Sequence, residues 1–148
     1  MTRRSATPVR FESEVADRLV SFVGAHPGLS LSAAANLLVD EGLRMSEYPG
    51  IVFRSGPSGR RAGLSGGPDV WEAVRAVKSA RQNEPDLSEK EIFSLVENNT
   101  GVPGSLLRIA LNYWAAHSDE VDAEIDAADQ AEATADVLWR REHDLLNH

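Results

Sequence analysis

The chain has 148 residues, of which 42% are hydrophobic and 26% are charged, enough for one packed domain or two very small ones. It contains no cysteine, which excludes disulfides, thiolate metal sites and a cysteine nucleophile and fits a reducing cytoplasm. Its sequence has no apolar run of about 18 residues and no apolar signal core near the first residue. We therefore expect a cytoplasmic protein that does not enter the membrane.

The charge is divided unevenly along the chain. Residues 1–63 contain 8 Arg and 6 Asp or Glu, a net of +2. Residues 64–148 contain 7 Lys or Arg and 17 Asp or Glu, a net of −10, and the two parts sum to −8. A weakly basic N-terminal part and a strongly acidic C-terminal part predict two partners that carry opposite charges.

The first 12 residues combine a basic arm with a predicted strand. Arg3 and Arg4 lie in the polar arm. Val9 and Phe11 then alternate with polar residues, and this period of two predicts a short strand over residues 7–12.

Two helices are predicted next, over residues 13–24 and from about residue 30 to residue 45, with a Pro-Gly turn between them. Ser32 is expected to be the N-cap of the second helix. A unit of fewer than about 40 residues with a single strand cannot bury enough surface or pair its strand edges alone. This predicts an obligate homodimer in which two chains pair their strands.

The predicted strand leads into Phe11-Glu12-Ser13-Glu14, and the inter-helix turn reads Gly28-Leu29-Ser30-Leu31-Ser32-Ala33. With these runs the segment resembles the ribbon-helix-helix family of DNA-binding repressors and antitoxins. The resemblance implies that the paired strands enter the major groove of operator DNA. Their outward positions would be Ala6, Pro8 and Arg10, of which only Arg10 can donate to a guanine.

The resemblance also implies phosphate contacts from Ser30 and Ser32 at the start of the second helix. Arg3 and Arg4 of the basic arm complete the predicted DNA-binding set. The alternatives are that Arg10 is a solvated charge on an exposed strand and that Ser32 only caps its helix.

Residues 46–69 contain six glycines and three prolines, which predicts a linker. The run Ile51-Val52-Phe53 is a strand candidate within it, so we expect the linker to form a small hairpin. The segment lacks the Gly-Lys-Ser/Thr ending of a phosphate-binding loop. Arg60 and Arg61 either contact the DNA backbone or are simply exposed.

Residues 70–118 are predicted to be a helical domain. Val70, Trp71, Val74 and Val77 predict a helix over residues 70–80. Two helices follow, joined by a short turn, which gives a helix-turn-helix shape. Their boundary signals are the Ser88/Glu91 capping box, the run Asn98-Asn99-Thr100-Gly101 and Pro103.

Four runs make residues 47–125 similar to the "domain of unknown function 433" family. They are Tyr48-Pro49-Gly50-Ile51, Val70-Trp71-Glu72-Ala73-Val74, Leu87-Ser88-Glu89-Lys90-Glu91-Ile92 and Leu107-Arg108-Ile109-Ala110-Leu111-Asn112-Tyr113-Trp114-Ala115-Ala116-His117. The resemblance implies a small helix-turn-helix-like domain, frequently of an antitoxin beside a PIN-like ribonuclease toxin. The usual Gly-Thr-Arg segment of that family is replaced here by Ser65-Gly66-Gly67-Pro68-Asp69. In the second helix of the pair, only Arg108 and Asn112 have polar side chains that could contact bases. A packed domain without a DNA-binding role is therefore favoured.

Residues 119–148 predict a long acidic helix with a narrow apolar seam. The seam comprises Val121, Ile125, Ala128, Ala131, Ala135 and Leu138. It packs on the chain's own core, on a dimer mate, or in a partner's groove. Trp139, Arg140 and Arg141 are of the residue types that dominate interface energies. In a PIN-like nuclease, such an Arg could pair with the metal-binding carboxylates. The expected partner-binding residues are Val121, Ile125, Leu138, Trp139, Arg140 and Arg141.

No enzyme is expected. The four histidines lack metal-ligand spacing and the sequence has no Gly-x-Ser-x-Gly elbow, so we assign no catalytic residue, metal or cofactor.

The sequence thus predicts a mainly α fold. Its parts are a ribbon-helix-helix dimerisation unit (1–45), a linker with a hairpin (46–69), a helix-turn-helix-like domain (70–118) and a partner-binding C-terminal helix (119–148). The predicted function is that of an antitoxin that neutralises a PIN-like ribonuclease and represses its own operon as a homodimer. The alternatives are a stand-alone regulator without a toxin and a dimeric adaptor that does not bind DNA.

Overall fold

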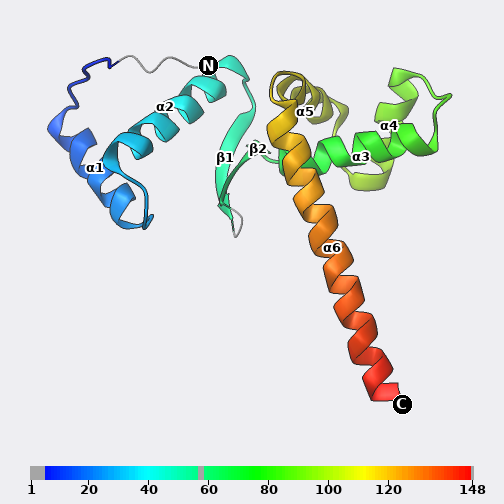
Figure 1. The fold of residues 1–148 in the computed structure, drawn as a ribbon. Helices are drawn as coiled ribbons and strands as arrows, with labels where there is room; N and C mark the ends of the chain where they lie inside the picture. Colours follow the sequence, from blue (N-terminus) through cyan, green and yellow to red (C-terminus); the bar gives the residue numbers. More distant parts are fainter. Residues whose placement is uncertain (1–5, 57–58, 148) are drawn as a thin grey trace. The chain divides into compact units, whose positions relative to one another are not determined.

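The computed structural model describes residues 6–56 and 59–147, and this part of the chain is mainly helical, as predicted. Its elements in chain order are α1 (Ser13–Gly24), α2 (Leu31–Glu47), β1 (Ile51–Gly56), β2 (Gly59–Leu64), α3 (Val70–Asn83), α4 (Glu89–Thr100), α5 (Gly104–Ala116) and α6 (Ser118–Asn147) (Figure 1). The chain divides into two units, Met1–Arg44 and Met45–His148, which are described separately below.

The first unit contains the two predicted helices, but residues 6–12 form no strand. The strand prediction is therefore wrong for the single chain. A strand is maintained by hydrogen bonds to a neighbouring strand, and residues 6–12 pair with no strand among the described residues. Arg3 and Arg4 lie outside the described residues.

The start of α2 corrects the predicted cap. The Ser30 hydroxyl accepts the N–H of Ala33 at 3.0 Å, so Ser30 is the capping residue. Ser32, which was expected to cap the helix, lies inside its first turn.

Helices α1 and α2 bury little apolar surface. The buried hydrophobic residues of this unit are Leu19 and Ala34. The exposed large ones are Val9, Phe11, Val15, Val20, Leu31, Val39 and Leu43. Two helices that leave so much apolar surface in water lack the core of an independent domain.

The second unit begins with the predicted hairpin. Strands β1 and β2 pair antiparallel, from Ile51 opposite Leu64 to Gly56 opposite Gly59. The segment is more than a linker, because Ile51, Ala62 and Leu64 are buried in the hydrophobic core of this unit.

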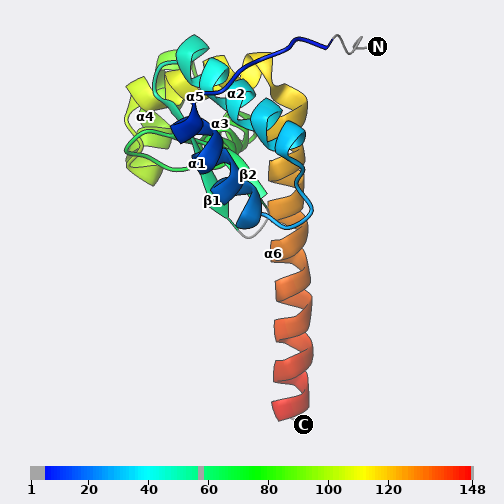
Figure 2. The same cartoon turned by 90° about the vertical axis from the view of Figure 1, so that its left-hand side faces the viewer.

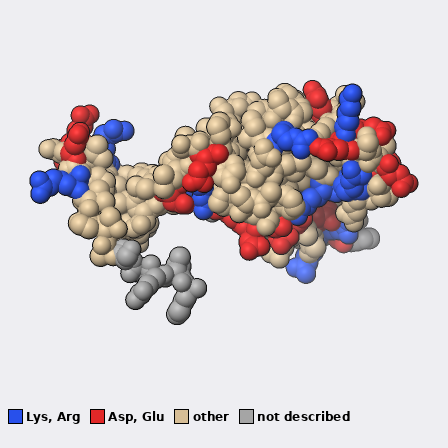
Figure 3. All heavy atoms as spheres, turned by 90° about the horizontal axis from the view of Figure 1, so that it is seen from above, with Lys and Arg blue, Asp and Glu red and all other residues tan. Residues whose placement is uncertain are grey.

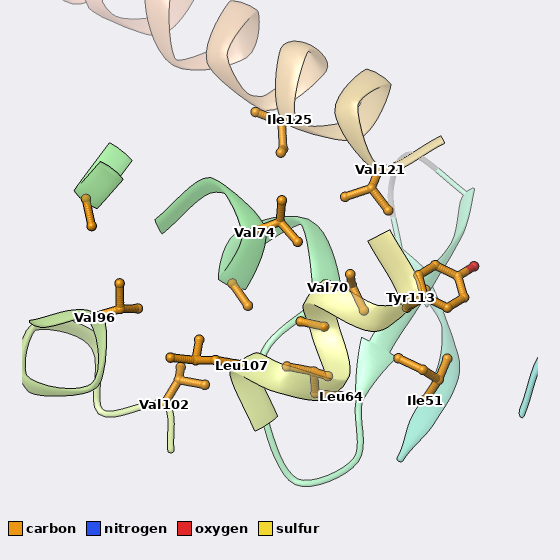
Figure 4. Close-up of a cluster of buried hydrophobic side chains, with 14 of the residues drawn as sticks. Ile51, Leu64, Val70, Val74, Val96, Val102, Leu107, Tyr113, Val121 and Ile125 are labelled. Carbon is orange, nitrogen blue, oxygen red and sulfur yellow. The ribbon is translucent and has the colours of Figure 1, made fainter. Parts of the chain in front are cut away.

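That core lies between the hairpin, α3, α4, α5 and the first turns of α6 (Figure 4). Its largest fully buried side chains include Leu107, Tyr113 and Val121. The boundary signals read from the sequence are confirmed at α4. Ser88 and Glu91 form the capping box, and Gly101 ends the helix with a left-handed φ of 76°. Three residues then connect α4 to α5, which gives the expected helix-turn-helix outline.

Helix α6 has 30 residues and a length of about 45 Å. Val121 and Ile125 are its buried residues, and every residue from 129 to 142 is exposed. Figures 1 and 2 show the helix continuing past the other elements of its unit toward the C-terminus. The predicted long C-terminal helix is thus confirmed, with a packed base and an exposed distal part.

Candidate functional site

The distal part of α6, residues 131–147, carries the largest exposed apolar side chains of the second unit. Leu138 is 57% exposed, Trp139 55%, Leu145 81% and Leu146 72%. Arg140 pairs with Asp136 at 3.0 Å, one turn away on the same helix. Trp139 stacks on His143 with a centroid distance of 3.8 Å, which holds the indole flat along the helix. We call residues 131–147 the distal segment.

Polar contacts between α5 and α6 hold the base of α6 in place. Tyr113 donates its hydroxyl to Glu120 at 2.8 Å, and Trp114 donates its indole N–H to Asp122 at 2.9 Å. Lys78 of α3 also binds Asp122, at 2.7 Å. Lys78 and the Trp114 N–H keep the pKa of the Asp122 carboxyl below its usual value. These contacts give the distal segment a fixed starting direction.

The predicted partner-binding residues fall into two groups. Leu138, Trp139, Arg140 and Arg141 lie together on the exposed distal segment. Val121 and Ile125 do not belong with them, because both are buried in the core of their own unit. The apolar seam therefore serves the internal core at its first two positions, which corrects the expectation that they bind a partner.

The predicted DNA-binding residues lie in the first unit. Arg10 is exposed just before α1, Ser30 is exposed at the N-cap of α2, and Ser32 is exposed in the first turn of that helix. The Ser30 hydroxyl caps the helix, while its remaining lone pair and the nearby N–H groups stay compatible with a phosphate. Arg10 lies on a different segment from the two serines.

A polar network that the sequence analysis missed joins the hairpin to α3. Arg54 and Arg61 are directly opposite each other across β1 and β2, and both bind the buried Asp69, at 3.2 and 2.8 Å. Two like charges opposite each other would repel, and the carboxylate between them offsets the repulsion. On the face drawn in Figure 3, Lys and Arg are interleaved with Asp and Glu. Finding this network required the hairpin register, which the Gly-rich sequence did not provide.

Among the described side chains, the Oε2 atom of Glu124 in α6 is the one buried polar atom without a hydrogen-bond partner. Burial, with smaller contributions from the charges of Glu120 and Asp69, raises the pKa of Glu124 to about 7, although Arg61 opposes the shift. Near neutral pH this carboxyl is therefore partly protonated.

The raised pKa of Glu124 predicts that stability falls as the pH rises from about 4.5 to about 7, since the folded state binds the proton more tightly than the unfolded state. Allowing for partial solvent exposure, the loss is about 1–2 kcal/mol. Glu124→Gln should therefore exceed the wild type in stability at pH 8 and match it at pH 4.5. Urea unfolding at the two pH values measures this, and an equal difference at both would contradict the assignment.

The helix-turn-helix outline does not present a polar reading surface. Arg108 forms an ion pair with Glu89 and covers the ring of Phe93. Asn112 is exposed, but Leu107, Ala110 and Tyr113 of the same helix face the core. This arrangement fits the expected packed domain better than a DNA-reading helix.

A pocket of about 450 Å³ opens between α3, α4 and α5, and no motif in the sequence indicated it. Its walls are mostly apolar, and its polar lining residues are Lys78, Arg81, Gln82 and Glu89. Within residues 6–56 and 59–147, no group of three or more His, Asp or Glu is placed to hold a metal ion. None of the described helices is long and apolar enough to cross a membrane.

Compared with protein-family models, curated proteins and solved structures, the chain matches none. The two family resemblances therefore remain predictions.

Proposed function

We propose that this chain is the antitoxin of a type II toxin–antitoxin pair, with a PIN-like ribonuclease as its toxin. The observation that carries the proposal is the distal segment of α6. It exposes Leu138, Trp139, Leu145 and Leu146 on a helix whose base is already packed. Soluble monomers rarely leave such an array in water, and Trp and Arg are enriched at the centres of protein interfaces. A groove on the toxin would cover this helix face.

The first unit supports the second half of the proposal, homodimerisation and operator binding. Its exposed apolar residues on α1 and α2 need a cover, and a second copy would supply one with matching chemistry. Pairing residues 6–12 of two chains would also create the missing strand ladder. Arg10 would then lie on the DNA-facing side of the ribbon, with the N-terminus of α2 near a phosphate.

Co-purification tests the proposal. The tagged chain is expressed together with its neighbouring gene, and the purified species is weighed by native mass spectrometry. A stoichiometric complex that inhibits the companion's ribonuclease activity is the expected result. A Trp139→Ala, Leu145→Ala double variant should lose the companion, while a Val15→Ala control in the first unit should retain it. A chain that purifies alone would contradict the toxin assignment.

Arg10→Ala is expected to weaken specific operator binding by about 1–3 kcal/mol, since one guanine-reading side chain is removed from each strand. Fluorescence anisotropy with operator and scrambled duplexes measures the loss. Arg18→Ala on α1 is the matched control, and its affinity should stay near that of the wild type. Equal operator binding by the Arg10 variant would contradict this role of Arg10, whereas absence of operator binding by the wild type would favour the dimeric adaptor.

A second candidate is a stand-alone regulator that senses a small effector. The pocket between α3, α4 and α5 favours it, because a ligand there could alter the unit to which α6 is attached. Operator binding by a chain without a companion would support this alternative over the antitoxin.

A further inference from the structure

The pocket between α3, α4 and α5 has the size and lining of a small-molecule site. Its volume of about 450 Å³ falls in the range of ligand pockets. The apolar walls are formed by Val74, Val77, Ile92, Phe93, Leu111 and Trp114. Val74, labelled in Figure 4, also belongs to the core, so the floor of the pocket is part of the packed interior.

The two aromatic walls are held in place by cations. Arg108 lies over the Phe93 ring at 4.6 Å, and Lys78 lies over the Trp114 ring at 5.2 Å. Trp114 is also fixed by its indole hydrogen bond to Asp122. Flat, immobilised rings suit a rigid apolar ligand body, because little side-chain entropy remains to be lost on binding.

The charges around the mouth are not equally compensated. Lys78 is neutralised by Asp122, and Glu89 is neutralised by Arg108. Arg81 differs, because its bonds within the described chain go only to main-chain carbonyls, those of Glu84, Pro85 and Leu87. These neutral acceptors leave its positive charge without a carboxylate, and all three bonds use the Nη1 nitrogen. The remaining guanidinium donors can still bind an anion in the fork geometry that a carboxylate fits.

We propose that this pocket binds a small amphipathic carboxylate, with its apolar body between Phe93 and Trp114 and its carboxylate on Arg81. The site is independent of the antitoxin proposal, since neither the distal segment nor the first unit contributes to it. Apolar burial supplies most of the affinity, and Arg81 supplies the preference for an anion over a neutral molecule of the same shape.

Calorimetric titration of the full chain with naphthoate and with neutral naphthalenemethanol tests the proposal. The wild type should bind naphthoate about tenfold more tightly, since one charge-assisted contact distinguishes the two ligands. Arg81→Gln should remove this preference, and Arg81→Lys should keep part of it. Lys90→Gln, which removes a cation of α4 outside the pocket, is the matched control and should change nothing. Absence of saturable binding, or a preference that survives in Arg81→Gln, would overturn the proposal.

Val77→Phe fills the pocket and keeps Arg81, so it tests the cavity separately from the charge. We expect it to weaken both ligands by more than tenfold without lowering the thermal midpoint. Should Arg81→Gln fail to fold, this variant and Arg81→Lys still decide the question. Unchanged ligand binding by Val77→Phe would overturn the proposal. So would a change in its oligomeric mass, because that would show the pocket to be covered by a second copy.

Discussion

A chain truncated after Gln130 is expected to keep its fold and to lose its protein partner. The truncation removes the distal segment, whose large apolar side chains are exposed, and with it one surface ion pair, between Glu132 and Arg75 of α3 at 3.0 Å. Val121 and Ile125 remain in the core, so the thermal midpoint should change little. Toxin affinity should fall at least a hundredfold, because the main interface residues are gone. Circular dichroism melting and surface plasmon resonance with the purified companion measure the two effects.

The position of the cut decides the outcome. Truncation after Ala116 would remove Val121 and Ile125 together with Glu120, which accepts the Tyr113 hydroxyl. That chain should be destabilised by several kcal/mol from the loss of two buried aliphatic side chains, at about 2 kcal/mol or more each. It therefore serves as the control for misfolding. Neutralisation of the toxin by the Gln130 truncation would contradict the role of the distal segment.

Asp69→Ala is expected to destabilise the second unit by about 3 kcal/mol. The substitution leaves Arg54 and Arg61 facing each other without the carboxylate between them. It also removes the N-cap carboxylate of α3, one half of the capping box in which Glu72 accepts the Asp69 main-chain N–H at 2.9 Å. The hairpin and α3 should therefore loosen together rather than separately.

Denaturant unfolding measures the effect, with Asp86→Ala as the control. Asp86 is exposed in the loop between α3 and α4, so its loss removes the same charge without disturbing a network. The control should stay within about 0.5 kcal/mol of the wild type. If the two variants unfold alike, the network contributes nothing to the stability of the unit.

Local signals in the sequence predicted the helices of the second unit well. Ser88 and Glu91 mark the start of α4, and Gly101 marks its end, because caps and left-handed turns depend on residues only a few positions apart. The apolar spacing of residues 121–138 likewise predicted a long helix. It could not show where packing stops, since that depends on how far α3 and α5 extend beside α6.

Features that depend on contacts distant in sequence were missed. The hairpin was predicted, but its place in the core was not, because six glycines obscure the alternation that buries Ile51, Ala62 and Leu64. Its register, which places Arg54 opposite Arg61, was not readable without the turn geometry. Residues 7–12 have the alternation of apolar and polar residues that is typical of a strand, but this alternation does not provide a neighbouring strand with which to pair. The sequence did not reveal the pocket, because its lining residues come from three helices that are brought together only by folding.

Because α6 is one unbroken helix, the packing of its base in the core fixes both the position of its distal segment and the direction in which the distal side chains point. Each residue of an α-helix advances the chain by about 1.5 Å and turns it by about 100°. The side of the helix on which Trp139 lies is therefore dictated by how Val121 and Ile125 settle in the core some four to five turns earlier. Inserting a single residue after Gln130 would leave every side chain intact and still present a different surface. The orientation in which a partner meets the distal segment would therefore depend on core residues that the partner does not contact.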